Sequence, residues 1–232
     1  MILSFHLADV GARAARGVQR TRLDASAVPG LRYALTMGAA RLGSRLLPAP
    51  QLGRVGLIAA WDDDGALDRF EAEHPLATTL ADGWSARLEP LRAYGSWRAL
   101  PDLPETPLPV DDSEPVAVIT LGRLRLARTL PFLRASARAE GQAVSDPALL
   151  AATGLARPPR IVATFSLWRT AAAMRAYAMG DNTGPGHIGA IRAHNAKSFH
   201  HESVFARFRP YGAVGAWDGR EPLAAATSEA AA

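Results

Sequence analysis

The sequence contains no cysteine and only one lysine, Lys197. Without cysteine, the chain cannot form disulfide bonds or use a thiolate to bind a metal or a haem iron. Almost all positive charge therefore comes from arginine. The net charge is only +4, and the arginines are spread along the chain and do not form one basic tract. This distribution does not indicate a nucleic acid partner.

Long apolar runs are also missing. No run approaches the roughly 20 residues that a transmembrane helix needs. The first apolar stretch, Met1–Leu7, is too short for a signal peptide and has no basic residues before it. We therefore expect a cytoplasmic protein without a transmembrane segment, and its 48% of hydrophobic residues is enough for one or two cores.

Apolar patterning predicts the same order of elements twice. The expected strands lie at 2–8, 54–61, within 84–97, 115–121 and 160–168, and the expected helices at 9–23, 65–74, 125–140 and 170–179. Residues 31–47 are interpreted as a short helix or an irregular segment. Residues 101–115 contain five prolines and are predicted to be a linker.

Short matches between the halves indicate a duplication. The triplet Ala152-Thr153-Gly154 echoes Thr36-Met37-Gly38, and the pair Ala206-Arg207 follows Ala86-Arg87 by 120 positions. Self-similarity on this scale predicts two tandem ferredoxin-like (split βαβ) units with pseudo-twofold symmetry, packed as an α+β barrel with the helices outside. The expected division is an N-terminal half at 1–104, a linker at 105–115, a C-terminal half at 116–222 and a disordered tail at 223–232.

One insertion breaks the symmetry. From the tryptophan that ends a strand to the shared Ala-Arg pair there are 25 steps in the first half (Trp61 to Ala86) and 38 in the second (Trp168 to Ala206). The extra 13 positions include a Gly/Pro/Asn loop at 180–186 and a predicted polar helix from His187. Because the first half is built without this material, the insertion is a candidate active-site element.

Four of the six histidines lie in or near this insertion, at His187, His194, His200 and His201. A spacing of seven residues aligns three of them on one helix face but separates neighbours by about 10.5 Å of rise. They cannot share one ion while the helix persists, because metal–ligand distances are roughly 2 Å. A single histidine can still hold a metal if a macrocycle supplies the other ligands, as in haem.

A family resemblance follows from these motifs. The pattern Gly186-His187-x-x-Ala190-Ile191-Arg192, then Phe199, then Glu202-x-x-Phe205-Ala206-Arg207-Phe208, resembles the spheroidene monooxygenase family, as do Thr164–Trp168 and the Gly-x-Trp that ends at Trp217. The resemblance implies a haem-dependent oxygenase that places a keto group on an acyclic carotenoid. The duplicated architecture is similar to that of chlorite dismutases, dye-decolorizing peroxidases and aldoxime dehydratases, in which haem sits on a proximal histidine of the C-terminal half.

The resemblance implies haem b with His187 as the ligand of its iron, while His194, His200 and His201 stay open as alternatives. Catalytic roles are expected for His187, Arg192 and Ser166. Arg192 is expected to meet a haem propionate or form a salt bridge. Cofactor contacts are expected from the following residues: His187, Ile191, Arg192, Thr164, Trp168, Phe199 and Phe205.

Other features have simpler interpretations. Thr164, Ser166 and Trp168 share one strand face by period two; they could line a pocket or pack in the sheet core. Asp62–Asp64 and Thr170 are predicted to cap helices. Glu202 could orient a histidine or the first turn of the last strand, or lie at the surface. The helix at 125–138 could bind an acidic redox partner or be a solvated face.

The expected partners are a hydrophobic small-molecule substrate and an electron-donor protein such as ferredoxin, with a homo-oligomer as a further possibility. Two alternatives to a haem monooxygenase stay open. One is a non-enzymatic protein that binds haem or a lipophilic ligand, and the other is a cofactor-free oxygenase or isomerase.

Overall fold

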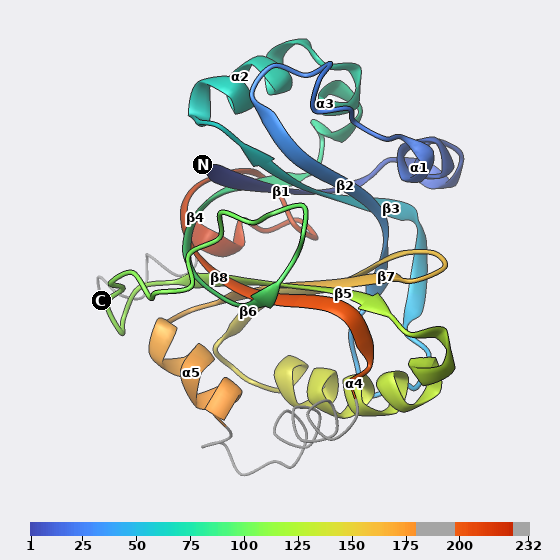
Figure 1. The fold of residues 1–232 in the computed structure, drawn as a ribbon, viewed down its shortest axis with the longest axis vertical. Coiled ribbons are helices and arrows are strands. Elements are labelled where there is room, and N and C mark those ends of the chain that lie inside the picture. The colour runs from blue at the N-terminus through green and yellow to red at the C-terminus, as the bar shows by residue number, and fades with distance from the viewer. Residues whose placement is uncertain (180–197, 225–232) are drawn as a thin grey trace.

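The computed structural model describes residues 1–179 and 198–224 (Figure 1). These residues form a closed barrel of eight antiparallel strands in the order β1-β3-β2-β6-β7-β5-β8-β4, with β4 pairing back to β1. The bounds of the strands are β1 Ile2–Asp9, β2 Leu31–Arg41, β3 Ala49–Trp61, β4 Trp84–Ser96, β5 Val116–Leu124, β6 Leu149–Arg157, β7 Ile161–Trp168 and β8 His200–Gly215.

The helices cover the outside of the barrel in two groups. Their bounds are α1 Gly11–Arg20, α2 Asp64–Glu73, α3 Pro75–Leu80, the short 3₁₀ helix η1 Leu126–Arg128, α4 Thr129–Val144 and α5 Ala171–Met179. Figure 1 shows α1, α2 and α3 on one side of the barrel and α4 and α5 on the opposite side. Each half of the chain therefore carries its own helical layer.

Side chains fill the interior of the barrel. Phe5 of β1 and Phe165 of β7 stack face to face with 3.9 Å between ring centroids, and both are fully buried. Trp84 and Trp217 complete this aromatic group. Alternate residues of every strand contribute to this core, as expected for a small closed barrel.

Two seams join the halves and follow the duplication. At the β4–β8 seam, Ala86 lies opposite Ala213 and Ala93 lies opposite Ala206, which is the reciprocal pairing that a twofold axis produces. The β2–β6 seam pairs Ala40 with Gly154, so the two echoing triplets lie on strands that touch. The prediction of two ferredoxin-like units packed as a pseudo-symmetric α+β barrel is confirmed.

The interpretation of residues 31–47 as a helix or an irregular segment is wrong, because Leu31–Arg41 is strand β2. Leu35, Met37 and Ala39 alternate toward the barrel core, and the strand pairs with β3 on one side and β6 on the other. The Ala- and Leu-rich composition favours a helix locally, but the two neighbouring strands override that preference.

The predicted helix caps are confirmed. The side chain of Asp63 accepts a hydrogen bond from the amide of Ala66 at 2.9 Å. In the second half, Thr170 Oγ1 accepts from the amide of Ala173 at 3.1 Å. Both acceptors satisfy amides that have no partner within the first turn of their helices.

The ends of the predicted segments can be located in part. Residues 101–115 contain no helix or strand, and they run beside β4, where Leu108 donates its amide to the carbonyl of Leu91 at 2.9 Å. Of the predicted tail 223–232, residues 225–232 lie outside the described residues, and Leu223 packs against the barrel core. No helix in the described ranges has both the length and the apolar character needed to cross a bilayer.

Candidate functional site

The predicted strand face around Thr164 lies on the helix side of the sheet. In β7, Ala163, Phe165 and Leu167 point into the barrel core, so Thr164 and Ser166 point the opposite way, toward the layer of α4 and α5. The indole Nε1 of Trp168 donates to Ser166 Oγ at 3.0 Å. This bond leaves the hydroxyl hydrogen of Ser166 available for another acceptor.

Residues of β5 and β8 extend this face. Thr164 lies opposite Thr120 of β5, and Thr120 lies opposite Phe205 of β8. The next row carries Ser166, then Val118, then Arg207. We call Thr120, Thr164, Ser166, Phe205 and Arg207 the C-terminal sheet face. The structure thus brings together three of the predicted site residues, Thr164, Ser166 and Phe205, beside the buried Trp168.

The equivalent face of the N-terminal half is closed. Trp61 lies opposite Ile2 and Trp168 lies opposite Val116, so counting back from the tryptophans makes Leu57 equivalent to Thr164. Ala59 is likewise equivalent to Ser166. Leu57 and Ala59 are fully buried, whereas Thr164 and Ser166 are half-buried. The second half has hydroxyl groups on a partly accessible face where the first half has sealed apolar packing.

Arg87 and Arg207 show a second difference between the halves. Arg87 is surrounded by carboxylates of α2 and contacts Asp64 at 2.8 Å, Asp68 at 2.5 Å and Glu71 at 3.0 Å. Its equivalent Arg207 faces α5, which contains no acidic residue. Among the described residues, no carboxylate lies within 4.0 Å of Arg207. Its buried Nε atom has no hydrogen-bond partner in the structure.

More positive charge surrounds Arg207. Arg92 of β4 is its direct partner across the β4–β8 seam, and within the described ranges the buried Nε atom of Arg92 also has no hydrogen-bond partner. Burial, followed by the charge of Arg175, lowers the pKa of Arg207. Arg175 itself is paired with Asp112. Two neighbouring guanidinium groups at this seam therefore favour an anion.

Of the four candidate histidines, the structure describes two, His200 and His201, and they lie in different places. His200 is half-buried with its ring 5.2 Å from that of Phe132 of α4. Its ring also covers Gly122 of β5, where an added Cβ would lie 2.5 Å from the imidazole. His200 therefore borders the C-terminal sheet face. His201 is exposed and lines a different pocket.

Several predicted residues fall outside the described ranges, namely His187, Ile191, Arg192 and His194. Phe199 is described and buried, with its ring 6.1 Å from that of Phe132. The guanidinium of Arg128 lies over the Phe199 ring at 5.6 Å. In the described part of the chain, no three histidine or carboxylate side chains gather as a metal site.

A pocket of about 910 Å³ lies at the end of the barrel and includes His201 and Glu202 in its wall. Tyr33 also lines it, and burial raises the pKa of Tyr33 to about 12. Glu202 accepts from Arg123 Nε at 3.2 Å and from the amide of Arg98. The carboxylate of Glu202 therefore joins the start of β8 to β5 and to the segment after β4, in keeping with the expected role at the start of the last strand.

Sequence reasoning missed Arg207, Arg92 and Thr120 as members of a possible site. A signal for Arg207 was present in the sequence, because α2 contains the three acids that contact Arg87, whereas α5 contains none. Arg207 belongs to the motif Phe205-Ala206-Arg207-Phe208, but the motif by itself assigns it no role. Arg92 and Thr120 become visible only once the strand register is known.

Comparison with known proteins identifies the family of this chain. No protein-family profile matches the chain. Spheroidene monooxygenase of Rhodobacter capsulatus is 30% identical over 193 residues, covering 81% of this chain and 79% of the relative. Spheroidene monooxygenase of Rubrivivax gelatinosus is 32% identical over 197 residues, covering 83% and 73%. These relatives define the class as oxidoreductases of the monooxygenase type. The chain belongs to the spheroidene monooxygenase family.

A solved structure shares the fold. The structure of aldoxime dehydratase superposes with a TM-score of 0.55 at 10% sequence identity, and the alignment covers 96% of this chain and 87% of that chain. At this level of identity the likeness supports the barrel architecture alone.

Proposed function

We propose that this protein is a haem-dependent monooxygenase that acts on a hydrophobic small molecule, a carotenoid or another secondary metabolite, with the haem iron held by His187. The observation that supports this most directly is the uncompensated Arg207 on a half-open sheet face of the C-terminal half. Membership of the spheroidene monooxygenase family supplies the reaction class. The resemblance of the motif around His187 supplies the ligand.

The C-terminal sheet face has groups that could contact the apolar surface of a haem and bind the carboxylates at its propionate edge. Haem has a broad apolar surface and two carboxylates, so it needs apolar contacts together with cations. Val118, Trp168 and the ring of Phe205 supply apolar surface on this face. The propionates would pair with Arg207 and Arg92, whose buried Nε atoms have no hydrogen-bond partners in the part of the chain that the structure describes. Bidentate binding of a carboxylate is the usual task of such guanidinium groups.

Each group of the chain then has a distinct task. Bound haem supplies the activation of oxygen, and the protein positions and shields it. Thr164 and Thr120 place hydroxyls on the face. Ser166 can donate its hydroxyl proton, because its oxygen already accepts from Trp168. In this proposal Arg192 pairs with a propionate, and Ile191 gives an apolar contact. Phe199 contributes to the site indirectly, because its ring packs against the ring of Phe132 of α4.

The reaction also needs electrons, because a monooxygenase reduces the second oxygen atom to water. An acidic donor protein such as ferredoxin would find a basic surface on α4, where Arg134 and Arg138 are exposed. This part of the proposal concerns the donor alone and leaves the haem ligand unaffected.

Titration with haemin tests the proposal. We expect a Soret band with saturable 1:1 binding, and turnover of an acyclic carotenoid with reductant and oxygen. His187→Ala should abolish the Soret band that depends on histidine ligation of the haem iron, whereas His200→Ala and His201→Ala should retain that band. Arg207→Met should weaken haem binding by roughly tenfold or more, the value of one charge-assisted hydrogen bond.

The other outcomes separate the alternatives. A spectrum lost with His200→Ala and kept with His187→Ala would move the ligand to His200. Haem binding without turnover would identify a haem-binding protein. Turnover by colourless protein would identify a cofactor-free enzyme and end the haem proposal.

A further inference from the structure

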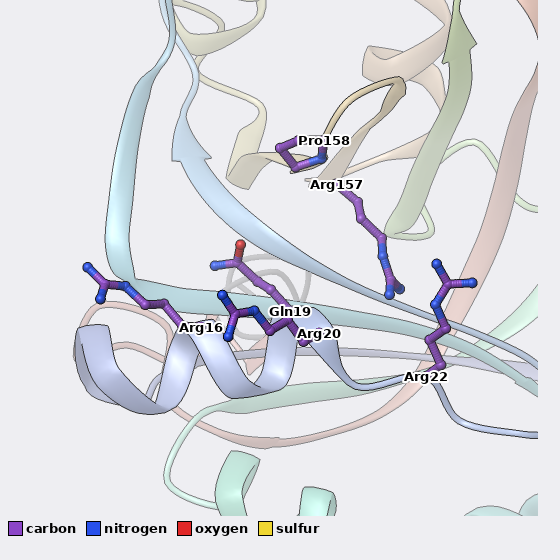
Figure 2. Close-up of a pocket in the computed structure, with 6 residues that line it drawn as sticks. All are labelled: Arg16, Gln19, Arg20, Arg22, Arg157 and Pro158. Carbon is purple, nitrogen blue, oxygen red and sulfur yellow. The ribbon is translucent and has the colours of Figure 1, made fainter.

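A second basic site lies where the two halves meet, between the helix α1 of the first half and strand β6 of the second. A pocket of about 520 Å³ opens between the end of α1 and the end of β6 (Figure 2). Its lining residues are Arg16, Gln19, Arg20, Arg22, Arg157 and Pro158. Four of these six are arginines, and none is acidic, so the pocket concentrates positive charge.

The arrangement of α1 explains why the arginines gather. Ala15 and Val18 are the residues that this helix buries against the sheet. Arg16 and Arg20 are both exposed and lie one turn apart. Like charges at this spacing destabilise a helix. No acidic residue occurs within α1 to offset them.

Arg157 is held from the other side of the pocket. Its Nη1 donates to Thr36 Oγ1 at 3.4 Å and its Nη2 donates to the carbonyl of Thr21 at 3.5 Å. Figure 2 shows the guanidinium groups of Arg157 and Arg22 pointing toward one another. Burial, followed by the charge of Arg22, lowers the pKa of Arg157. The fold therefore holds the guanidinium groups of Arg157 and Arg22 close together despite their electrostatic repulsion.

Several other arginines of the protein are neutralised by carboxylates. Arg32 contacts two carboxylates, Arg87 three and Arg209 two. In the described ranges, none of the four pocket arginines has a carboxylate within 4.0 Å. A ligand that carries negative charge would relieve the repulsion among them.

We propose that this pocket binds the phosphate or pyrophosphate group of a ligand other than haem. Guanidinium groups bind phosphate oxygens in bidentate fashion, and four of them around one pocket match an anion with at least two negative charges. Arg22 and Arg157 also line the wider pocket at the end of the barrel, together with Tyr33, Leu35 and other residues. The organic part of the ligand has space there. This site is independent of the haem proposal.

Calorimetric titration of the full chain with sodium pyrophosphate at low ionic strength tests the site. We expect saturable binding and a higher melting temperature with the anion. The double variant Arg16→Gln/Arg20→Gln should weaken binding by roughly 100-fold, about tenfold for each guanidinium. Both side chains are exposed, so the variant should fold, and its haemin titration should match that of the parent protein.

The matched control is Arg134→Gln/Arg138→Gln on α4, which removes the same charge from exposed positions on the other helical layer. It should bind pyrophosphate as the parent does. Equal weakening in both double variants, or no saturable binding by the parent, would overturn the proposal, because binding would then follow net charge alone or be absent.

Vesicles distinguish the two sources of such a group. Phosphatidylcholine vesicles with and without phosphatidic acid are sedimented with the protein, in the presence and absence of pyrophosphate. Binding that requires phosphatidic acid and is blocked by pyrophosphate assigns the site to a lipid headgroup. Pyrophosphate binding without vesicle binding assigns it to a soluble phosphorylated molecule. Either result supports the proposed site if the Arg16→Gln/Arg20→Gln variant loses the binding that was observed.

Discussion

Replacing Arg87 and Arg207 by methionine compares the same residue in two different environments. Arg87 contacts three carboxylates, and its side chain is 26% exposed. Its partners Asp64, Asp68 and Glu71 are 49%, 61% and 35% exposed. Pairs with this much solvent contact contribute about 0.3–1 kcal/mol each. Arg87→Met should therefore lower the free energy of unfolding by about 1–2 kcal/mol.

Arg207→Met should behave differently in protein without haem. The change removes a buried Nε atom that has no hydrogen-bond partner among residues 1–179 and 198–224, and a buried donor left unsatisfied costs about 1–3 kcal/mol. Methionine keeps the apolar stem and removes that cost. We therefore expect this variant to be as stable as the parent protein, or more stable by up to about 1 kcal/mol.

Urea unfolding of the haem-free proteins, followed by circular dichroism, measures both changes. Arg209→Met is a control in the same strand, because Arg209 contacts Glu89 and Glu114; it should be destabilised by about 1 kcal/mol. If Arg207→Met loses as much stability as Arg87→Met, then Arg207 already has a counter-ion, and the argument for an external anion at this face fails.

Three further predictions concern stability. Burial, followed by the charge of Arg87, lowers the pKa of His6 to about 4. In the unfolded chain the pKa of histidine is about 6.5, so the unfolded state binds the proton more tightly. Roughly 3 kcal/mol of the free energy of unfolding should therefore be lost as the pH falls from 6.5 to 4. Urea unfolding at several pH values should show a flatter profile for His6→Leu, and identical profiles would contradict the assignment. Gly122→Ala should cost about 1–3 kcal/mol because its Cβ would lie 2.5 Å from the His200 ring, whereas Gly212→Ala, with its nearest contact at 3.6 Å, should be close to neutral in thermal unfolding. Thr170→Ala and Asp63→Ala remove equivalent caps, so each should lower stability by about 1 kcal/mol in chemical denaturation, and a neutral result for either would deny its cap an energetic role.

Much of the architecture could be predicted from the sequence because both halves of the chain contain the same order of elements. The tryptophans that end β3 and β7 and the Ala-Arg pairs in β4 and β8 identify equivalent strands. The error at Leu31–Arg41 has a physical origin, since alanine and leucine favour a helix unless neighbouring strands intervene. The structure explains the echo between Met37 and Thr153, because they lie in the equivalent strands β2 and β6, which pair with each other.

The candidate site was less predictable. Period two shows that Thr164 and Ser166 share a face, but it does not say whether that face points inward or outward. Only the register reveals that Arg207 and Phe205 share this face through Val118 and Thr120. Long-range pairing of this kind leaves no local pattern in the sequence.

The closed ring has a consequence for how the protein can be divided. Each half supplies four strands, and its two outermost strands hydrogen-bond to the other half through the β4–β8 and β2–β6 seams. A half expressed singly would present two bare strand borders and the exposed rings of Phe5 or Phe165, so it should aggregate or self-associate. A single unit of this kind could complete the ring only by pairing both of its outer strands with a second copy.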